Sequence, residues 1–122
     1  MTRDPIASLR DAEEIELVTR GRRTGRPHAV RLWSAYDDGL LWLRADPEAD
    51  WYRNLRAESR CQIRVDGIEM RGVREPSTDT DADLRRLVEL WRAKYGNEWV
   101  GDWYVERGRT PVRIRVISAE RA

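Results

Sequence analysis

The 122-residue chain contains no phenylalanine and only one cysteine, one histidine and one lysine. A single cysteine excludes an internal disulfide and a zinc site built from several thiolates, and a single histidine excludes a cluster of imidazole ligands. The longest apolar run, 40–43, has four residues, whereas a membrane-spanning helix needs about 20. A Walker loop and a GxGxxG fingerprint are both missing from the sequence.

Neither sign of charge is in excess. The 23 basic and 22 acidic side chains give a net charge of +1, which excludes a polyanionic tail or a histone-like polycation. Interspersed carboxylates also argue against a barrel that binds nucleic acid through its arginines. No apolar segment follows the basic N-terminus, so the sequence predicts a soluble, cytoplasmic protein without a membrane span.

The large aromatic side chains are six tryptophans and four tyrosines. Each of these rings has a polar atom that needs a hydrogen-bond partner or a solvent edge. We therefore expect some of them to line a cleft instead of filling a sealed core.

Alternation of apolar and polar residues predicts about six short strands, at 14–20, 27–35, 40–45, 61–65, 68–73 and from Pro111 onward. Asp46-Pro47 predicts the start of a short helix ending near Glu58, and Ser77 or Thr78 predicts the cap of a long helix that Gly96 ends. Two Asp-Gly turns favour antiparallel hairpins. The expected fold is one mainly β domain over 1–122, an antiparallel barrel with two helices, preceded by a loose or helical extension at 1–12.

The strongest local motif is the arginine-rich segment 19–26 between the first two predicted strands. Its two glycines allow backbone N–H groups to point into one concavity, and four arginines and two threonines surround them. Such a loop suits a phosphate or a polycarboxylate, because guanidinium groups bind these anions in bidentate fashion. The alternative is a solvated hairpin tip on an arginine-rich chain.

A second motif lies on the short helix, at 51–55. Trp51 and Leu55 share one face and pack inward, whereas Asn54 lies nearer the rim. An indole beside an amide suits a ribityl-phosphate chain, and the alternative is an ordinary amphipathic helix. No nucleophile-elbow sequence accompanies His28, and no paired carboxylates lie in an apolar setting. An enzyme with this sequence would therefore take its reactive atoms from a cofactor.

Together the two motifs resemble the deazaflavin-dependent nitroreductase family, whose members have the split β-barrel fold of flavin-binding pyridoxamine-phosphate oxidases. The family's TTTGRKSG loop stands here as VTRGRRTG (18–25), and its WYHNL motif stands as WYRNL (51–55). The resemblance extends from about Ile15 to Val116. The segment WRAKYG (91–96) is also similar to an uncharacterised branch of the same fold.

The resemblance implies a reductase that passes a hydride from reduced coenzyme F420 to a quinone, a nitroaromatic or a similar electron-poor acceptor. It implies cofactor contacts from Arg22, Arg23, Thr24, Arg26, His28, Arg44, Ala45, Trp51 and Asn54. The turn residues would meet the phosphate and the acidic oligoglutamate tail, and the backbone at 44–45 would run beside the deazaflavin. On the residue evidence alone, a single histidine in a strand, such as His28, is usually a surface or hydrogen-bonded residue.

Aromatic side chains are expected to face the acceptor, and we assign this role to Trp33, Tyr95, Trp99 and Trp103. Trp99 and Trp103 equally suit a dimer contact, because aromatic residues are enriched at interfaces. The sequence also departs from the family pattern: 46–50 is short and acidic where a glycine-rich, lysine-bearing segment is usual. This change should weaken phosphate binding.

Two further functions of the same fold stay open. One is an FMN-binding split-barrel oxidoreductase, which would use a shorter and less acidic cofactor. The other is a cofactor-free split barrel that acts as a scaffold or binding protein. Split barrels often pair through their sheets, so a homodimer is expected by analogy.

Overall fold

The computed structural model describes residues 4–97, 100 and 108–121. Three helices and seven strands follow one another along the chain: α1 (Pro5–Asp11), β1 (Glu14–Arg20), β2 (Pro27–Trp33), β3 (Ala35–Asp37), β4 (Leu40–Ala45), α2 (Asp50–Ala57), β5 (Arg60–Val65), β6 (Ile68–Glu75), α3 (Thr80–Tyr95) and β7 (Thr110–Arg121).

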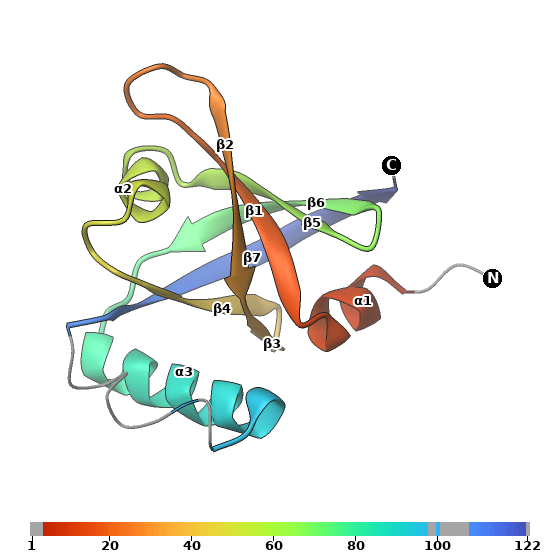
Figure 1. The fold of residues 1–122 in the computed structure, drawn as a ribbon, viewed down its shortest axis with the longest axis vertical. Helices are drawn as coiled ribbons and strands as arrows, with labels where there is room; N and C mark the ends of the chain where they lie inside the picture. Colours follow the sequence, from red (N-terminus) through yellow and green to blue (C-terminus); the bar gives the residue numbers. More distant parts are fainter. Residues whose placement is uncertain (1–3, 98–99, 101–107, 122) are drawn as a thin grey trace.

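The strands form one antiparallel sheet in the order β2-β1-β5-β6-β7-β4-β3. The sheet curls so that β2 also contacts β4, a strand with which it does not pair. The β1–β2 hairpin projects beyond α2 at one end of the molecule, and α3 lies across the opposite end (Figure 1). The predicted antiparallel, mainly β architecture is confirmed.

The sheet has seven strands instead of about six because the predicted second strand is broken at Ser34. This residue is fully buried, and its backbone is bonded to α3 side chains instead of to a strand. Its amide donates to the Tyr95 hydroxyl (3.0 Å), and its carbonyl accepts from the Lys94 amine (2.7 Å). The chain therefore bends there and continues as β3.

The helix starts also differ from the expectation. Asp46 accepts from the Glu48 amide (2.9 Å) and so closes a turn, and α2 begins only at Asp50. Asp79, not Ser77 or Thr78, caps α3 by accepting from the Ala82 amide. Within the described part of the chain, no helix is long and apolar enough to span a membrane.

Two buried clusters hold the elements together. The larger fills the curled sheet and includes Leu9 of α1, so part of the N-terminal extension belongs to the core. The smaller lies between α3 and β3–β4, and it contains the apolar stripe of α3: Leu84, Leu87, Val88 and Trp91. Cys61 is buried in the larger cluster, as its alternation with Ile63 and Val65 predicts.

Candidate functional site

The arginine-rich segment 21–26, called here the guanidinium turn, is closed by its own backbone. The Gly21 amide donates to the Arg26 carbonyl (2.7 Å), the Gly25 amide donates to the Gly21 carbonyl (2.8 Å), and the Arg26 amide donates to the Thr24 hydroxyl. The two glycine N–H groups are therefore used within the turn. The groups that the turn presents to solvent include its exposed side chains.

Asn54 of α2 and Arg22 of the turn, which the sequence placed around one cavity, are bonded directly to each other. The Asn54 Oδ1 accepts from the Arg22 backbone amide (3.1 Å) and from Arg22 Nη1 (2.7 Å). Arg22 Nη2 also lies 3.1 Å from Asp50 Oδ1, one helical turn earlier on α2. The turn is thus attached to the helix through one side chain.

The other turn residues face solvent: Arg23, Thr24 and Arg26 are exposed, and so is His28 at the start of β2. The His28 ring lies over Gly21, where an added Cβ would come within 2.8 Å of His28 Nε2 and 2.9 Å of Thr24 Oγ1. The absence of a side chain at position 21 therefore lets the ring approach the backbone. The side of the turn that remains available to a ligand carries two guanidinium groups.

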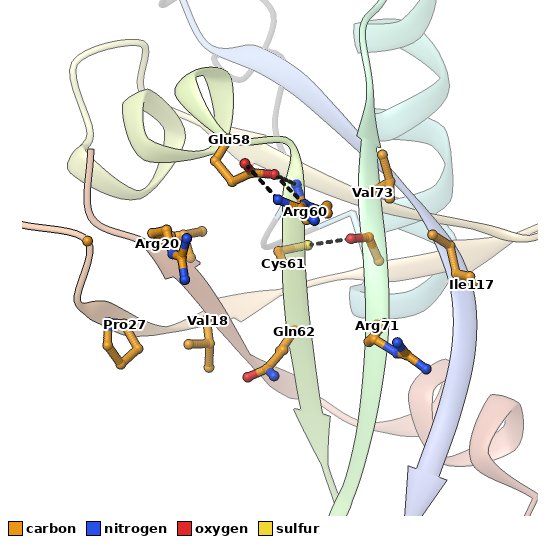
Figure 2. Close-up of a pocket in the computed structure, with 13 residues that line it drawn as sticks. Val18, Arg20, Pro27, Glu58, Arg60, Cys61, Gln62, Arg71, Val73 and Ile117 are labelled. Atoms are coloured by element: carbon orange, nitrogen blue, oxygen red, sulfur yellow. Dashed lines mark hydrogen bonds and ion pairs between the residues drawn. The ribbon is translucent and has the colours of Figure 1, made fainter. Parts of the chain in front are cut away.

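A groove with a volume of about 650 Å³ runs from the base of this turn across the outer face of the sheet. Figure 2 shows side chains of the neighbouring strands on its walls, with Val18 on β1, Gln62 on β5, Arg71 on β6 and Ile117 on β7. Apolar side chains form part of its surface: Val18, Val73 and Ile117. Gly25 and Pro27 also line it, so the groove and the guanidinium turn are continuous.

The groove is cationic although the whole chain is almost neutral. Among the described residues that line it, three are arginines (Arg20, Arg60 and Arg71) and one is a carboxylate, Glu58. The Arg60 guanidinium and amide bond this carboxylate and lower the pKa of Glu58 to about 2, so it is ionised at neutral pH. On the same face of the sheet, but outside the groove lining, Arg64 is bonded to Glu16 (3.2 Å).

A β-bulge shapes the far wall. Gly72 of β6 pairs with Val116 of β7, whereas Arg71 pairs with Ser118, so Ile117 is an extra residue in β7. Its side chain is 60% exposed, which leaves an aliphatic surface on the groove. Bulges commonly lie beside functional sites, because they redirect one side chain out of the ladder.

The sequence analysis missed these groove residues. Outward-facing Gln62 and Arg71 were visible in the alternation of their strands, and the Asp66-Gly67 turn brings them opposite each other. The neighbouring position of Val18 depends on pairing between β1 and β5, which no local signal reveals.

None of the nine predicted cofactor residues is itself among the residues that line the groove, and the turn reaches it through Gly25 and Pro27. Three of the nine lie apart from the turn and from its contacts with Asn54. Arg44 and Ala45 are at the end of β4, where they pair with Pro111 and Thr110 of β7. Trp51 packs against the larger core cluster, with its ring 6.3 Å from that of Tyr52. Their role in cofactor binding stays a prediction.

The described aromatic residues assigned to the acceptor pack together at the other end of the hairpin. The Trp33 ring stacks on that of Tyr95, with centroids 4.1 Å apart and an interplanar angle of 16°. Trp33 ends β2 and Pro27 begins it, so six residues, or about 20 Å, separate this stack from the turn. The structure therefore does not bring Trp33 and Tyr95 to the groove. Trp99 and Trp103 lie outside the described residues.

A family model described as F420H2-dependent quinone reductase matches residues 6–118. The chain belongs to this family. The resemblance that rested on the turn and on the helix motif is thereby confirmed. No curated protein matches the chain.

Solved structures share the fold at low sequence identity. An F420 reductase is 20% identical, with a TM-score of 0.75 and 98% of each chain covered. A Bacteroides thetaiotaomicron protein named for 5-nitroimidazole antibiotic resistance is 17% identical (TM-score 0.77; 97% of this chain and 82% of that one). An FAD-binding protein from Mesorhizobium loti is 20% identical (TM-score 0.70; 93% and 86%). The fold is thus the split β-barrel of the flavin-binding type.

Proposed function

We propose that this protein is a reductase that uses reduced F420 and passes a hydride to an electron-poor acceptor, a quinone or a nitroaromatic. Membership of the F420H2-dependent quinone reductase family supports the cofactor. The single structural observation that carries the proposal is the cationic groove that opens at the guanidinium turn.

The residues present suit such a cofactor. F420 combines a flat deazaflavin with a phosphate and an acidic tail. The aliphatic surface of Val73 and Ile117 offers contact for a planar ring, and the exposed guanidinium groups of Arg23 and Arg26 offer bidentate partners for anions. A volume of about 650 Å³ is within the range of ligand-binding pockets.

The chemistry follows from what the lining groups can do. The bound cofactor would supply a hydride from its C5 atom, and the chain's own side chains orient donor and acceptor in the groove. The reduced acceptor also needs a proton. Glu58 is ionised, and burial raises the pKa of the Cys61 thiol to about 12, so neither group is suited to exchange a proton near neutral pH. We infer that water in the open groove provides the proton.

The proposal is tested by titrating the purified protein with F420 and with FMN while tryptophan fluorescence is recorded. We expect F420 to bind more tightly than FMN by about tenfold or more, and its affinity to fall with added salt because exposed ion pairs are screened. Tighter binding of FMN would support an FMN-binding oxidoreductase, which the FAD-binding structural neighbour favours. Binding of neither would support a cofactor-free scaffold.

Groove variants locate the site. Arg20→Ala combined with Arg71→Ala should weaken F420 binding about tenfold or more and slow the oxidation of F420H2 by a naphthoquinone. Arg64→Ala is the control, because Arg64 lies on the same outer face but is not among the residues that line the groove. Equal effects of the two changes would show that the groove is not the site.

Two further proposals are a cytoplasmic location, which rests on the composition of the sequence, and a homodimer formed through the sheets, which rests on the resemblance. Sedimentation equilibrium of the purified protein measures the second directly, and a single species of the monomer mass would contradict it.

A further inference from the structure

Arg22 differs from the exposed arginines of the guanidinium turn because its head group is occupied within the protein. Its side chain is 20% exposed, and its two terminal nitrogens lie 2.7 Å from Asn54 Oδ1 and 3.1 Å from Asp50 Oδ1. Asp50 and Asn54 are four residues apart on α2 and so share one helix face. Arg22 therefore spans one turn of the helix and is not directed toward solvent.

The amide of Asn54 has little capacity left for a ligand. The residue is 2% exposed, and its Oδ1 accepts two hydrogen bonds, both from Arg22. A carbonyl oxygen has two lone pairs, so this acceptor is fully used. The Nδ2 group donates to the Thr19 hydroxyl at 3.4 Å, and Thr19 is itself 1% exposed at the end of β1.

These contacts connect three segments of the chain. Thr19 belongs to β1, Arg22 to the turn, and Asn54 to α2, and the amide of Asn54 bonds the other two. The ion pair with Asp50 adds little, because that carboxylate is 82% exposed and screened by water. The buried amide is the main connection, since an unsatisfied polar group at this depth is costly.

We propose that Asn54 is a positioning residue that acts through Arg22: it holds the guanidinium turn on α2 so that Arg23 and Arg26 project toward the anionic part of the cofactor. This inference rests on the proposed function and assigns Asn54 and Arg22 a different role from the cofactor contacts that the family resemblance implies. Its physical basis is preorganisation, because a turn already held in place loses less conformational freedom on binding.

A double-mutant cycle separates the two roles. Asn54→Ala and Arg22→Ala should each weaken F420 binding by about tenfold, and the double variant should be no weaker than either single one, because both remove the same connection. If Asn54 contacts the cofactor independently of Arg22, the fold-losses multiply, and the proposal is overturned.

Asn54→Asp provides a readout that a general loss of stability would not produce. Aspartate keeps the acceptor for Arg22 and adds a negative charge, so we expect F420 affinity to stay within about threefold of the wild type. If the phosphate instead lay against position 54, the added charge would repel it, and a loss of about tenfold or more would overturn the proposal.

Hydrogen exchange tests the connection without any cofactor. The Arg22 amide donates to Asn54 Oδ1, so its exchange should accelerate in Asn54→Ala and remain slow in Asn54→Asp. Failure of the wild type to bind F420 would refute the proposed function while leaving this measurement to decide the Arg22–Asn54 connection. An unchanged exchange rate in Asn54→Ala would refute the connection itself.

Discussion

The two ends of the β1–β2 hairpin both depend on buried polar contacts, yet they present opposite surfaces. At the turn end, the buried amide of Asn54 bonds Arg22, and the neighbouring guanidinium groups remain in solvent. At the α3 end, the Tyr95 hydroxyl bonds the backbone of Glu13 and Ser34, and its ring is stacked on Trp33.

The two networks differ in the charged groups that they leave exposed to solvent. At the α3 end, Lys94 donates to the Ser34 carbonyl at the break in the strand, and Trp91 Nε1 donates to the Trp42 carbonyl of β4 (3.2 Å). The turn end uses one arginine as an anchor and leaves charges directed outward. The contacts at the α3 end are typical of a region that stabilises the fold. The contacts at the turn end are typical of a preorganised binding surface.

The largest expected effect follows from removing the anchor at the α3 end. Trp91 is 4% exposed, and Trp91→Ala should lower the free energy of unfolding by about 3–5 kcal/mol, because it leaves a cavity in the smaller core cluster. Urea denaturation measures this loss. Ile117→Ala, at an exposed position, should cost under about 0.5 kcal/mol. Similar losses in both variants would contradict the assignment of these two regions.

The next effect belongs to the turn end and concerns binding instead of stability. Arg23→Ala with Arg26→Ala should weaken F420 binding by about 10- to 100-fold at low salt, since each guanidinium is expected to make a charge-assisted hydrogen bond. The free energy of unfolding should stay within about 0.5 kcal/mol of the wild type. Calorimetric titration at two salt concentrations measures the loss.

The exposed residue Arg85 on α3 supplies the control for that experiment. Arg85→Ala removes one positive charge at the opposite end of the molecule, so it reports the effect of net charge alone. A loss of affinity in Arg85→Ala comparable to that of the turn variant would show that the field of the whole protein, and not the turn, attracts the cofactor.

The smallest effect is a pH dependence of stability at the α3 end. Burial lowers the pKa of Lys94 to about 8 from 10.5, so above pH 8 the folded protein releases a proton that the unfolded chain retains. The free energy of unfolding should therefore rise with pH from about 8, by less than about 1 kcal/mol because the amine is partly exposed.

Lys94→Met should remove this rise. The comparison is made between pH 8 and 9, because Cys61 affects stability above pH 9. Burial raises the pKa of its thiol to about 12 from 9.0, so above pH 9 this group lowers the free energy of unfolding as the pH rises. Denaturation curves of the two proteins across this window provide the measurement. A parallel rise in both would show that another group is responsible.

The predictable part of the fold is the part encoded locally. Alternation located β1 and β5 almost to the residue, and Asp66 and Gly67 adopt the positive φ angles (51° and 72°) that their turn requires. The acidic Asp46 misled the assignment of the α2 start because the same side chain can cap a turn or a helix.

The two motifs of the candidate site could be recognised in the sequence because each is a continuous segment of the chain. Their proximity is correct, but the bonds between them depend on the depth of Asn54 and the course of one arginine side chain. Neither property has a sequence signal. The groove was missed for a related reason, since the pairing of β1 with β5 joins segments on either side of α2.

The extra residue in β7 has a consequence for how the sheet keeps its alignment. On one side of Ile117 the strands β6 and β7 pair in one frame, and on the other side they pair in a frame displaced by a residue. A shift of β7 by one residue would break the pairing on one side or the other of the bulge, so the register of the strand is fixed. The wall of the groove is thereby held at a constant offset from the opposite strands, independently of the loops that join them.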